Sequence, residues 1–190
     1  MLLKIKIFLI FLFIYSCQPI EIVAPIEIDN SKLEKISISA KDLLLNIKYN
    51  PIFSENNIED QINNPPIEII TSWINENISN FGNENTFVIN IIDASITKKE
   101  IDNTDSKKYS EKTVFQYEVF FLIEYELLDD SGFLIANSTV ESSRSTTSPK
   151  YISLNESELI INDVLYSALK DFTNETVTLL DVYMSGYLNN

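Results

Sequence analysis

The most regular pattern along the chain is an alternation of apolar and polar side chains between Val114 and Leu128. One parity is entirely apolar, and its members are Phe115, Tyr117, Val119, Phe121, Ile123, Tyr125 and Leu127. A period of two residues with one apolar face predicts a long antiparallel strand that is buried on one side. The sequence Asp129-Asp130-Ser131-Gly132 predicts a hairpin turn, and a second strand is expected from Phe133 to Ser145.

Two earlier segments alternate in the same way and predict two more strands. One runs from Phe87 to Ile101, and the other runs from Ile36 to Tyr49, where the apolar parity changes near Lys41. We expect this change of phase to mark a bulge or a sharp bend within a single strand. Residues 50–66 are mostly polar and predict a loop.

Apolar residues at helical spacing predict two helices. The first is expected to begin at Pro66 and to stop at Gly82, with an apolar stripe formed by Ile67, Ile70, Ile74, Ile78 and Phe81. The second is a long helix from Asn155 to Leu188, preceded by Ser153 and Glu156 at the spacing of a capping box. Its inward stripe comprises Leu165, Leu169, Phe172, Thr176, Leu179 and Tyr183.

These elements run in the order β-α-β-β-β-α and predict an α+β fold of two layers. A four-stranded, mostly antiparallel sheet is expected to form one layer, with both helices covering one of its faces. Residues 35–190 are expected to form a single domain, because their number suits one hydrophobic core. Residues 17–34 contain Pro19, Pro25 and a polar stretch, and they predict an extended tether.

The first sixteen residues predict a signal peptide that is not part of the fold. Lys4 and Lys6 precede an apolar run that ends at Ile14, which is shorter than the about 20 residues needed to span a bilayer. The run continues into Tyr15-Ser16-Cys17 and resembles the lipobox of bacterial lipoproteins. That resemblance implies cleavage between Ser16 and Cys17 and lipid attached to the Cys17 thiol. The alternative is an uncleaved anchor helix with an incidental cysteine.

Lipid on Cys17 would make a membrane the first partner of this protein. Two or three acyl chains hold a protein firmly, whereas one chain anchors it only marginally. Gln18 follows the cysteine. In well-studied Gram-negative bacteria, aspartate at that position retains a lipoprotein in the inner membrane. We therefore expect attachment to the outer membrane, with the domain facing the periplasm.

The composition narrows the classes of partner and of chemistry. Without residues 1–16 the chain keeps 12 basic and 28 acidic residues, and this net charge of −16 disfavours nucleic acid as a partner. The chain has no histidine, and Cys17 is its only cysteine. Catalysis by histidine or cysteine and a structural zinc site are therefore disfavoured, and we expect no metal, no cofactor and no intramolecular disulfide.

Few residues remain as candidates for a site. Asp129 and Asp130 could bind a cation or hydrolyse a glycoside, but hydrogen bonding within the predicted turn is the simpler interpretation. Trp73, the only tryptophan, and Arg144, the only arginine, are candidate contacts for a partner. Core packing is the alternative for Trp73, and pairing with a surface carboxylate is the alternative for Arg144. If the strand that holds Arg144 lies at a sheet edge, it could also accept a partner's strand.

Several short motifs, taken in order, resemble a family of short, uncharacterised alphaproteobacterial lipoproteins. They lie within residues 40–188 and are Pro65-Pro66 with Trp73, Ile92-Asp93-Ala94-Ser95, Tyr117, Ser143-Arg144-Ser145 and Ser153-Leu154-Asn155-Glu156. Because this family is functionally unassigned, the resemblance supplies no catalytic residues. The order of the elements also resembles that of small envelope accessory lipoproteins, such as the transport-auxiliary and lipopolysaccharide-assembly types.

The sequence therefore predicts a membrane-anchored, non-catalytic accessory lipoprotein. Its expected partner is a protein of an envelope transport or assembly machine. Two other functions stay open. An envelope enzyme that uses carboxylates would need two acids facing one cleft, and a lipid carrier would need an apolar cavity between the sheet and the helices.

Overall fold

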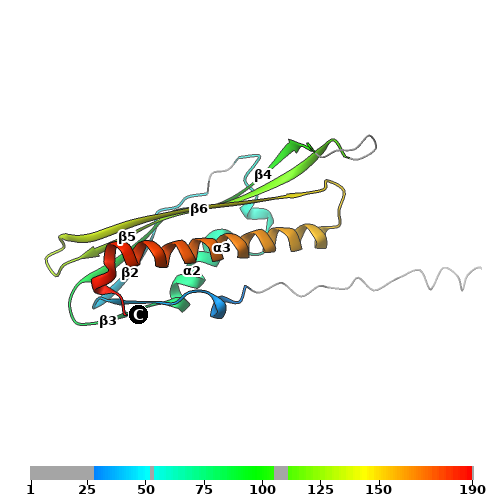
Figure 1. Ribbon diagram of the computed structural model, residues 1–190. Coiled ribbons are helices and arrows are strands. Elements are labelled where there is room, and N and C mark those ends of the chain that lie inside the picture. The colour runs from blue at the N-terminus through cyan, green and yellow to red at the C-terminus, as the bar shows by residue number, and fades with distance from the viewer. Residues whose placement is uncertain (1–27, 52–53, 105–110, 190) are drawn as a thin grey trace, which may run out of the picture.

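The computed structural model describes residues 28–51, 54–104 and 111–189 of the 190-residue chain (Figure 1). Its main sheet has the strand order β2-β4-β5-β6, formed by β2 (Asp42–Ile47), β4 (Thr86–Asp102), β5 (Thr113–Leu128) and β6 (Leu134–Ser148). β2 is parallel to β4, and the other two pairs are antiparallel. The predicted α+β class and the four-stranded, mostly antiparallel sheet are confirmed.

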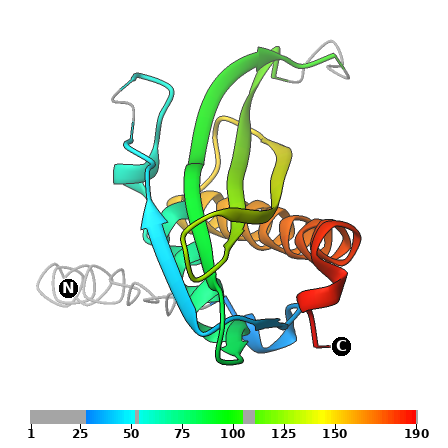
Figure 2. The same cartoon turned by 90° about the vertical axis from the view of Figure 1, so that its left-hand side faces the viewer.

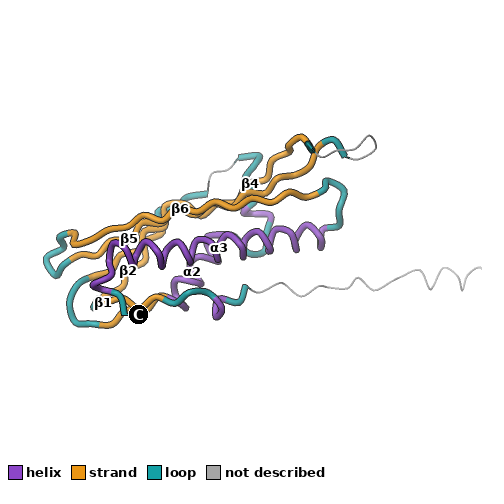
Figure 3. Tube along the Cα trace, viewed as in Figure 1, coloured by secondary structure: helices purple, strands orange, loops and turns teal. Residues whose placement is uncertain are grey.

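Two helices form the second layer. They are α2 (Pro66–Asn77) and the long α3 (Leu154–Met184), and both lie on one side of the sheet in Figure 1 and Figure 3. Figure 2 shows β4 and β5 curving around the side on which α3 lies. The helices meet the sheet through aromatic rings, because Phe172 of α3 packs 6.1 Å from Trp73 of α2 and 5.5 Å from Phe121 of β5, between ring centroids.

The apolar parity of β5 faces this layer, as its alternation predicts. Tyr117, Val119, Phe121, Ile123, Tyr125 and Leu127 are all buried. The column packs directly against neighbouring side chains, with the Tyr125 ring stacked on Phe87 at 5.8 Å. Aromatic side chains therefore fill the space that a lipid carrier would need to keep open.

The segment predicted as one strand from Ile36 to Tyr49 is two strands in two different sheets. β1 (Ile36–Ser39) pairs in parallel with β3 (Ile78–Phe81), and the chain crosses at Ala40 into β2 of the main sheet. The expected single strand was wrong here. The change of parity marks a change of sheet, because both halves alternate while each faces a different partner.

The first helix is shorter than predicted. α2 ends at Asn77, and Ile78 already belongs to β3. Ile78 and Phe81 continue the helical spacing, but pairing with β1 satisfies the backbone of residues 78–81 as a strand instead. Gly82 does not cap the helix. Its φ of +121° places it in a turn that leads to β4, a conformation that favours glycine.

Hydrogen bonds confirm the predicted turn at Asp129 and the predicted cap at Ser153. The Asp129 side chain accepts from the backbone N–H groups of Ser131 and Phe133, both at 2.8 Å, so it serves the turn between β5 and β6. Ser153 caps α3, since its hydroxyl accepts from the Glu156 N–H at 3.2 Å and the Glu156 carboxylate accepts from the Ser153 N–H at 2.9 Å.

Part of the expected tether is fastened to the domain. Asn30 and Leu33 are buried, and a short 3-10 helix, Asn30–Lys32, lies against α2. The Asn77 amide of α2 donates to the carbonyl oxygens of Asn30, Leu33 and Glu34 at 2.9, 3.1 and 3.2 Å. Residues 28–34 therefore pack with the fold, while residues 17–27 lie outside the described residues.

Candidate functional site

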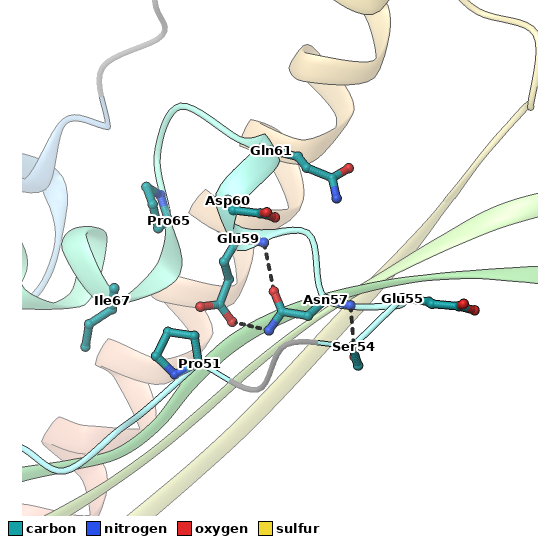
Figure 4. Close-up of a pocket in the computed structure, with 9 residues that line it drawn as sticks. All are labelled: Pro51, Ser54, Glu55, Asn57, Glu59, Asp60, Gln61, Pro65 and Ile67. Atoms are coloured by element: carbon teal, nitrogen blue, oxygen red, sulfur yellow. Dashed lines mark hydrogen bonds between the residues drawn. The ribbon is translucent and has the colours of Figure 1, made fainter.

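The loop that follows β2 surrounds an open hollow of about 540 Å³ (Figure 4). This loop also holds a one-turn 3-10 helix, Glu59–Gln61, and its Asn57 forms an isolated bridge with Thr97 of β4. The Lys98 N–H of β4 donates to the Asn56 carbonyl oxygen at 2.7 Å, which pins the loop to the sheet. The lining residues are Pro51, Ser54, Glu55, Asn57, Glu59, Asp60, Gln61, Pro65 and Ile67.

Glu59 is the central polar residue of this hollow. It is only 7% exposed, and it is the one charged residue that is buried within the described part of the chain. Its Oε1 atom accepts a hydrogen bond from the Tyr49 hydroxyl and another from Asn57 Nδ2 at 2.9 Å. Asn57 Oδ1 in turn accepts from the Glu59 N–H at 2.9 Å. We call Tyr49, Asn57 and Glu59 the Glu59 cluster.

The Glu59 cluster also raises the pKa of Tyr49. Burial raises the pKa of the Tyr49 phenol, and the hydrogen bond to Glu59 raises it further, as do the negative charges of Glu59 and Asp93. A phenol held next to two carboxylates keeps its proton because the phenolate would be repelled by both. Tyr49 is therefore a donor to Glu59 throughout the physiological range, and it cannot serve as a base there.

We expect alkaline pH to destabilise the protein in part through Tyr49. Its pKa is raised in the folded state above the unfolded value of about 10, so its contribution is present below pH 10 and is lost as the pH rises above it. Tyr49→Phe should cost about 1 kcal/mol at pH 7, because Glu59 loses one donor. Urea unfolding from pH 7 to 11 should show a shallower alkaline loss for Tyr49→Phe than for the wild type.

The matched control for this measurement is Tyr151→Phe. Tyr151 is 87% exposed, so its removal should leave both the stability and its pH dependence unchanged. An alkaline slope that Tyr49→Phe does not alter would show that the pair contributes nothing to stability.

Three acidic residues, Glu55, Glu59 and Asp60, line the hollow. Figure 4 shows the Glu59 side chain pointing towards Pro51 and Ile67, while the Glu55 side chain extends away from them. Glycoside hydrolysis needs two carboxyl groups that flank one bond, with one able to exchange a proton. The Glu59 carboxylate instead accepts from two donors of its own chain. The Glu59 carboxylate is therefore bound within its own chain and is not a free acid in the hollow.

The sequence-predicted site residues lie apart from this hollow. The Trp73 side chain is fully buried in the core, and its Nε1 donates to the Glu34 carbonyl oxygen at 3.3 Å, so it offers no surface to a partner. Arg144 of β6 forms an ion pair with Asp171 of α3 at 2.6 Å. Asp130 accepts from the Asn85 N–H at 3.1 Å. Ser16 and Cys17 lie outside the described residues.

Two further properties concern residues 28–51, 54–104 and 111–189 alone. Within these ranges, no three side chains among histidine, cysteine, aspartate and glutamate are placed to share a metal ion. No helix in the same ranges has the length and apolar character needed to cross a membrane.

Comparison with known proteins gives structural likenesses of low similarity. No family model matches the chain, and no curated protein matches it. A minor lipoprotein from Acinetobacter baumannii is 10% identical, with a TM-score of 0.42 over 80% of this chain and 98% of that chain. A protein from Helicobacter pylori, described as a neuraminyllactose-binding hemagglutinin homolog, is 12% identical, with a TM-score of 0.35 over 80% and 91%. These TM-scores do not establish a shared fold.

Proposed function

We propose that this protein is a lipid-anchored, non-catalytic accessory lipoprotein of the bacterial envelope. Its role would be to hold a protein partner of a transport or assembly machine. The Glu59 cluster supports a non-catalytic role, because the buried carboxylate of the hollow already accepts hydrogen bonds from Tyr49 and Asn57. The absence of histidine from the whole chain supports the same conclusion.

The anchor would be lipid attached to Cys17. Cleavage after Ser16 would remove the signal peptide and make Cys17 the first residue. Residues 17–27 would link that lipid to the domain, and 11 extended residues reach at most about 40 Å. The next residues are fastened to α2 through Asn77, so the domain cannot move farther from the bilayer without breaking buried hydrogen bonds. Such a short link suits a protein that works beside a membrane machine.

The anchor is tested by mass spectrometry of the N-terminal peptide from native membranes. We expect the peptide to begin at Cys17 and to carry acyl chains, and Cys17→Ser should move the protein from the membrane to the soluble fraction. An intact Met1 or an unmodified Cys17 in native membranes would refute the proposal. The outer-membrane assignment has its own variant, since Gln18→Asp should keep the protein in the inner membrane.

The partner is tested by crosslinking in intact cells, followed by purification from detergent-solubilised membranes. We expect one envelope protein to be recovered in stoichiometric amount with the lipidated chain. Recovery of no stoichiometric protein under several crosslinking conditions would count against a binding role, even if Cys17 is lipidated.

A further inference from the structure

Strand β6 forms one edge of the main sheet. Its pairing with β5 runs without a shift from Phe115↔Ser148 to Leu127↔Ala136, and no described strand lies on its other side. In an antiparallel edge strand, every second residue points its N–H and C=O groups away from the sheet. β6 therefore presents a long row of backbone donors and acceptors to any extended chain that approaches it.

This edge lacks most of the features that usually protect one. Native proteins block edges with proline, lysine, bulges or a short strand. The sequence Leu134–Ser148 contains no proline, lysine or glycine, and most of it consists of serine, threonine and other small side chains. The register shift lies only at the turn end, between Leu127 and Leu128 of β5. α3 lies beneath β6, and no described strand pairs with its outer edge (Figure 1).

Acidic side chains lie on both sides of this edge. On the sheet face away from the helices, β6 carries the exposed Glu141. On the same face, Glu118 and Glu124 of β5 pair with Lys99 and Lys48. On the other side, α3 has six acidic residues against the single cation Lys170. Within α3, the exposed Asp171 and Glu175 follow one another at helical spacing, next to Arg144 of β6. A strand added to β6 would therefore lie beside Glu141 on one face and beside the acidic helix α3 on the other.

These charges decide between the chains that could occupy the edge. A second copy of this protein would bring its own Glu141 and acidic α3 to the same place, and the net charge of −16 without the signal peptide opposes that. The segment 18–27 carries Glu21 and Glu27 and no cation. We infer that the β6 edge binds an extended, lysine- or arginine-containing segment of a partner protein by strand addition.

Arg144 adds directionality to this recognition. It lies on the helix side of β6, where its charge and that of Asp171 cancel in an ion pair, so this side offers no free carboxylate to a cation beside Arg144. Glu141 lies on the opposite side and makes no ion pair among the described residues. The bound segment should therefore place its cations on the face away from the helices, beside Glu141, and small or apolar side chains over α3. This inference deepens the proposed binding function and rests on it.

The test is hydrogen exchange of the full chain with a synthetic peptide of about ten residues that alternates lysine with valine and threonine. We expect the outward-facing amides between Thr139 and Thr146 to exchange about tenfold more slowly when the peptide is saturating. The matched peptide keeps every lysine but has two neighbouring prolines at its centre, so it retains the charge and loses the backbone donors. It should give no protection.

Charge variants of the protein complete the test. Glu141→Lys should weaken binding of the lysine peptide about three- to tenfold, whereas Glu68→Lys on α2 makes the same charge change elsewhere and should weaken it less than twofold. Equal binding of both peptides, protection outside β6 or equal effects of the two variants would overturn the inference. These outcomes are independent of the lipid on Cys17 and of the recovery of a partner from membranes. The inference can therefore fail while the proposed function remains supported.

Discussion

Trp73→Ala is expected to destabilise the protein by about 3–5 kcal/mol, a large share of the about 5–15 kcal/mol that holds an ordinary domain folded. The indole is fully buried and lies edge-on to the Phe172 ring, with 6.1 Å between centroids and an interplanar angle of 89°. Removing it would leave a cavity where α2, α3 and β5 meet. It would also remove the Nε1 donor from the Glu34 carbonyl oxygen. Urea unfolding followed by far-UV circular dichroism would measure the loss.

The control for this substitution is Tyr151→Ala, which removes an aromatic ring that is 87% exposed. It should change the free energy of unfolding by less than about 0.5 kcal/mol. Because Trp73 is the only tryptophan, its fluorescence reports on the core without interference from a second indole. Emission at short wavelength in the wild type should move to long wavelength on unfolding. A loss below about 1 kcal/mol for Trp73→Ala would show that the ring is not a core residue.

The elements that the sequence predicted well are those in which local pattern and tertiary environment agree. One parity of β5 is apolar without interruption, and it is the buried one in the structure. The turn and the α3 cap depend on side chains that bond within four residues of themselves, so their chemistry is visible in the sequence. Local hydrogen bonds and a single buried face are the features that one sequence can specify.

The elements that were missed depend on distant pairing. Ile78 and Phe81 fit a helical stripe as well as they fit a strand, and only β1, about forty residues earlier, decides between the two. The same pairing separates β1 from β2, since each takes a different neighbour across the break at Ala40. No periodicity within 36–49 contains that information.

The Glu59 cluster could not be predicted from the sequence either. Asn57 and Glu59 stand in a segment whose composition is that of a solvated loop, and Tyr49 was assigned only to the end of a strand. They come together because the loop folds back on β4 through Asn56 and Asn57. A buried carboxylate in such a loop gives no signal in the sequence until its donors are known. Residues 28–34 were assigned to the tether for the same reason, because their hydrogen-bond partners Ser72, Trp73 and Asn77 lie about forty residues later in the chain.

Asn77→Asp is expected to cost about 3–5 kcal/mol at pH 7, the second large effect on stability. Asn77 is 4% exposed, and its Nδ2 is the shared donor for the carbonyl oxygens of Asn30, Leu33 and Glu34. An ionised carboxylate there could donate to none of them, and it would face three oxygen atoms without water. Residues 28–34 should then detach from α2, and their amides should exchange faster with solvent.

The pH dependence of the stability of Asn77→Asp distinguishes the effect of a buried charge from the effect of losing the amide donors. Burial and the facing oxygens should raise the pKa of the new carboxyl group above its unfolded value of about 3.9, because both penalise the charged form. Its protonated form can still donate once, so the variant should be least damaged below about pH 4 and should lose stability as the pH rises towards 7. Asn77→Leu removes the donors without adding charge, and it should cost about 2 kcal/mol at either pH. Urea unfolding of both variants and the wild type at pH 4 and 7 decides the point. If Asn77→Asp and Asn77→Leu lose the same stability at both pH values, the added charge contributes nothing to the damage. If neither variant loses stability, the amide does not hold residues 28–34 by its donors, and the link between Cys17 and the domain is longer than residues 17–27.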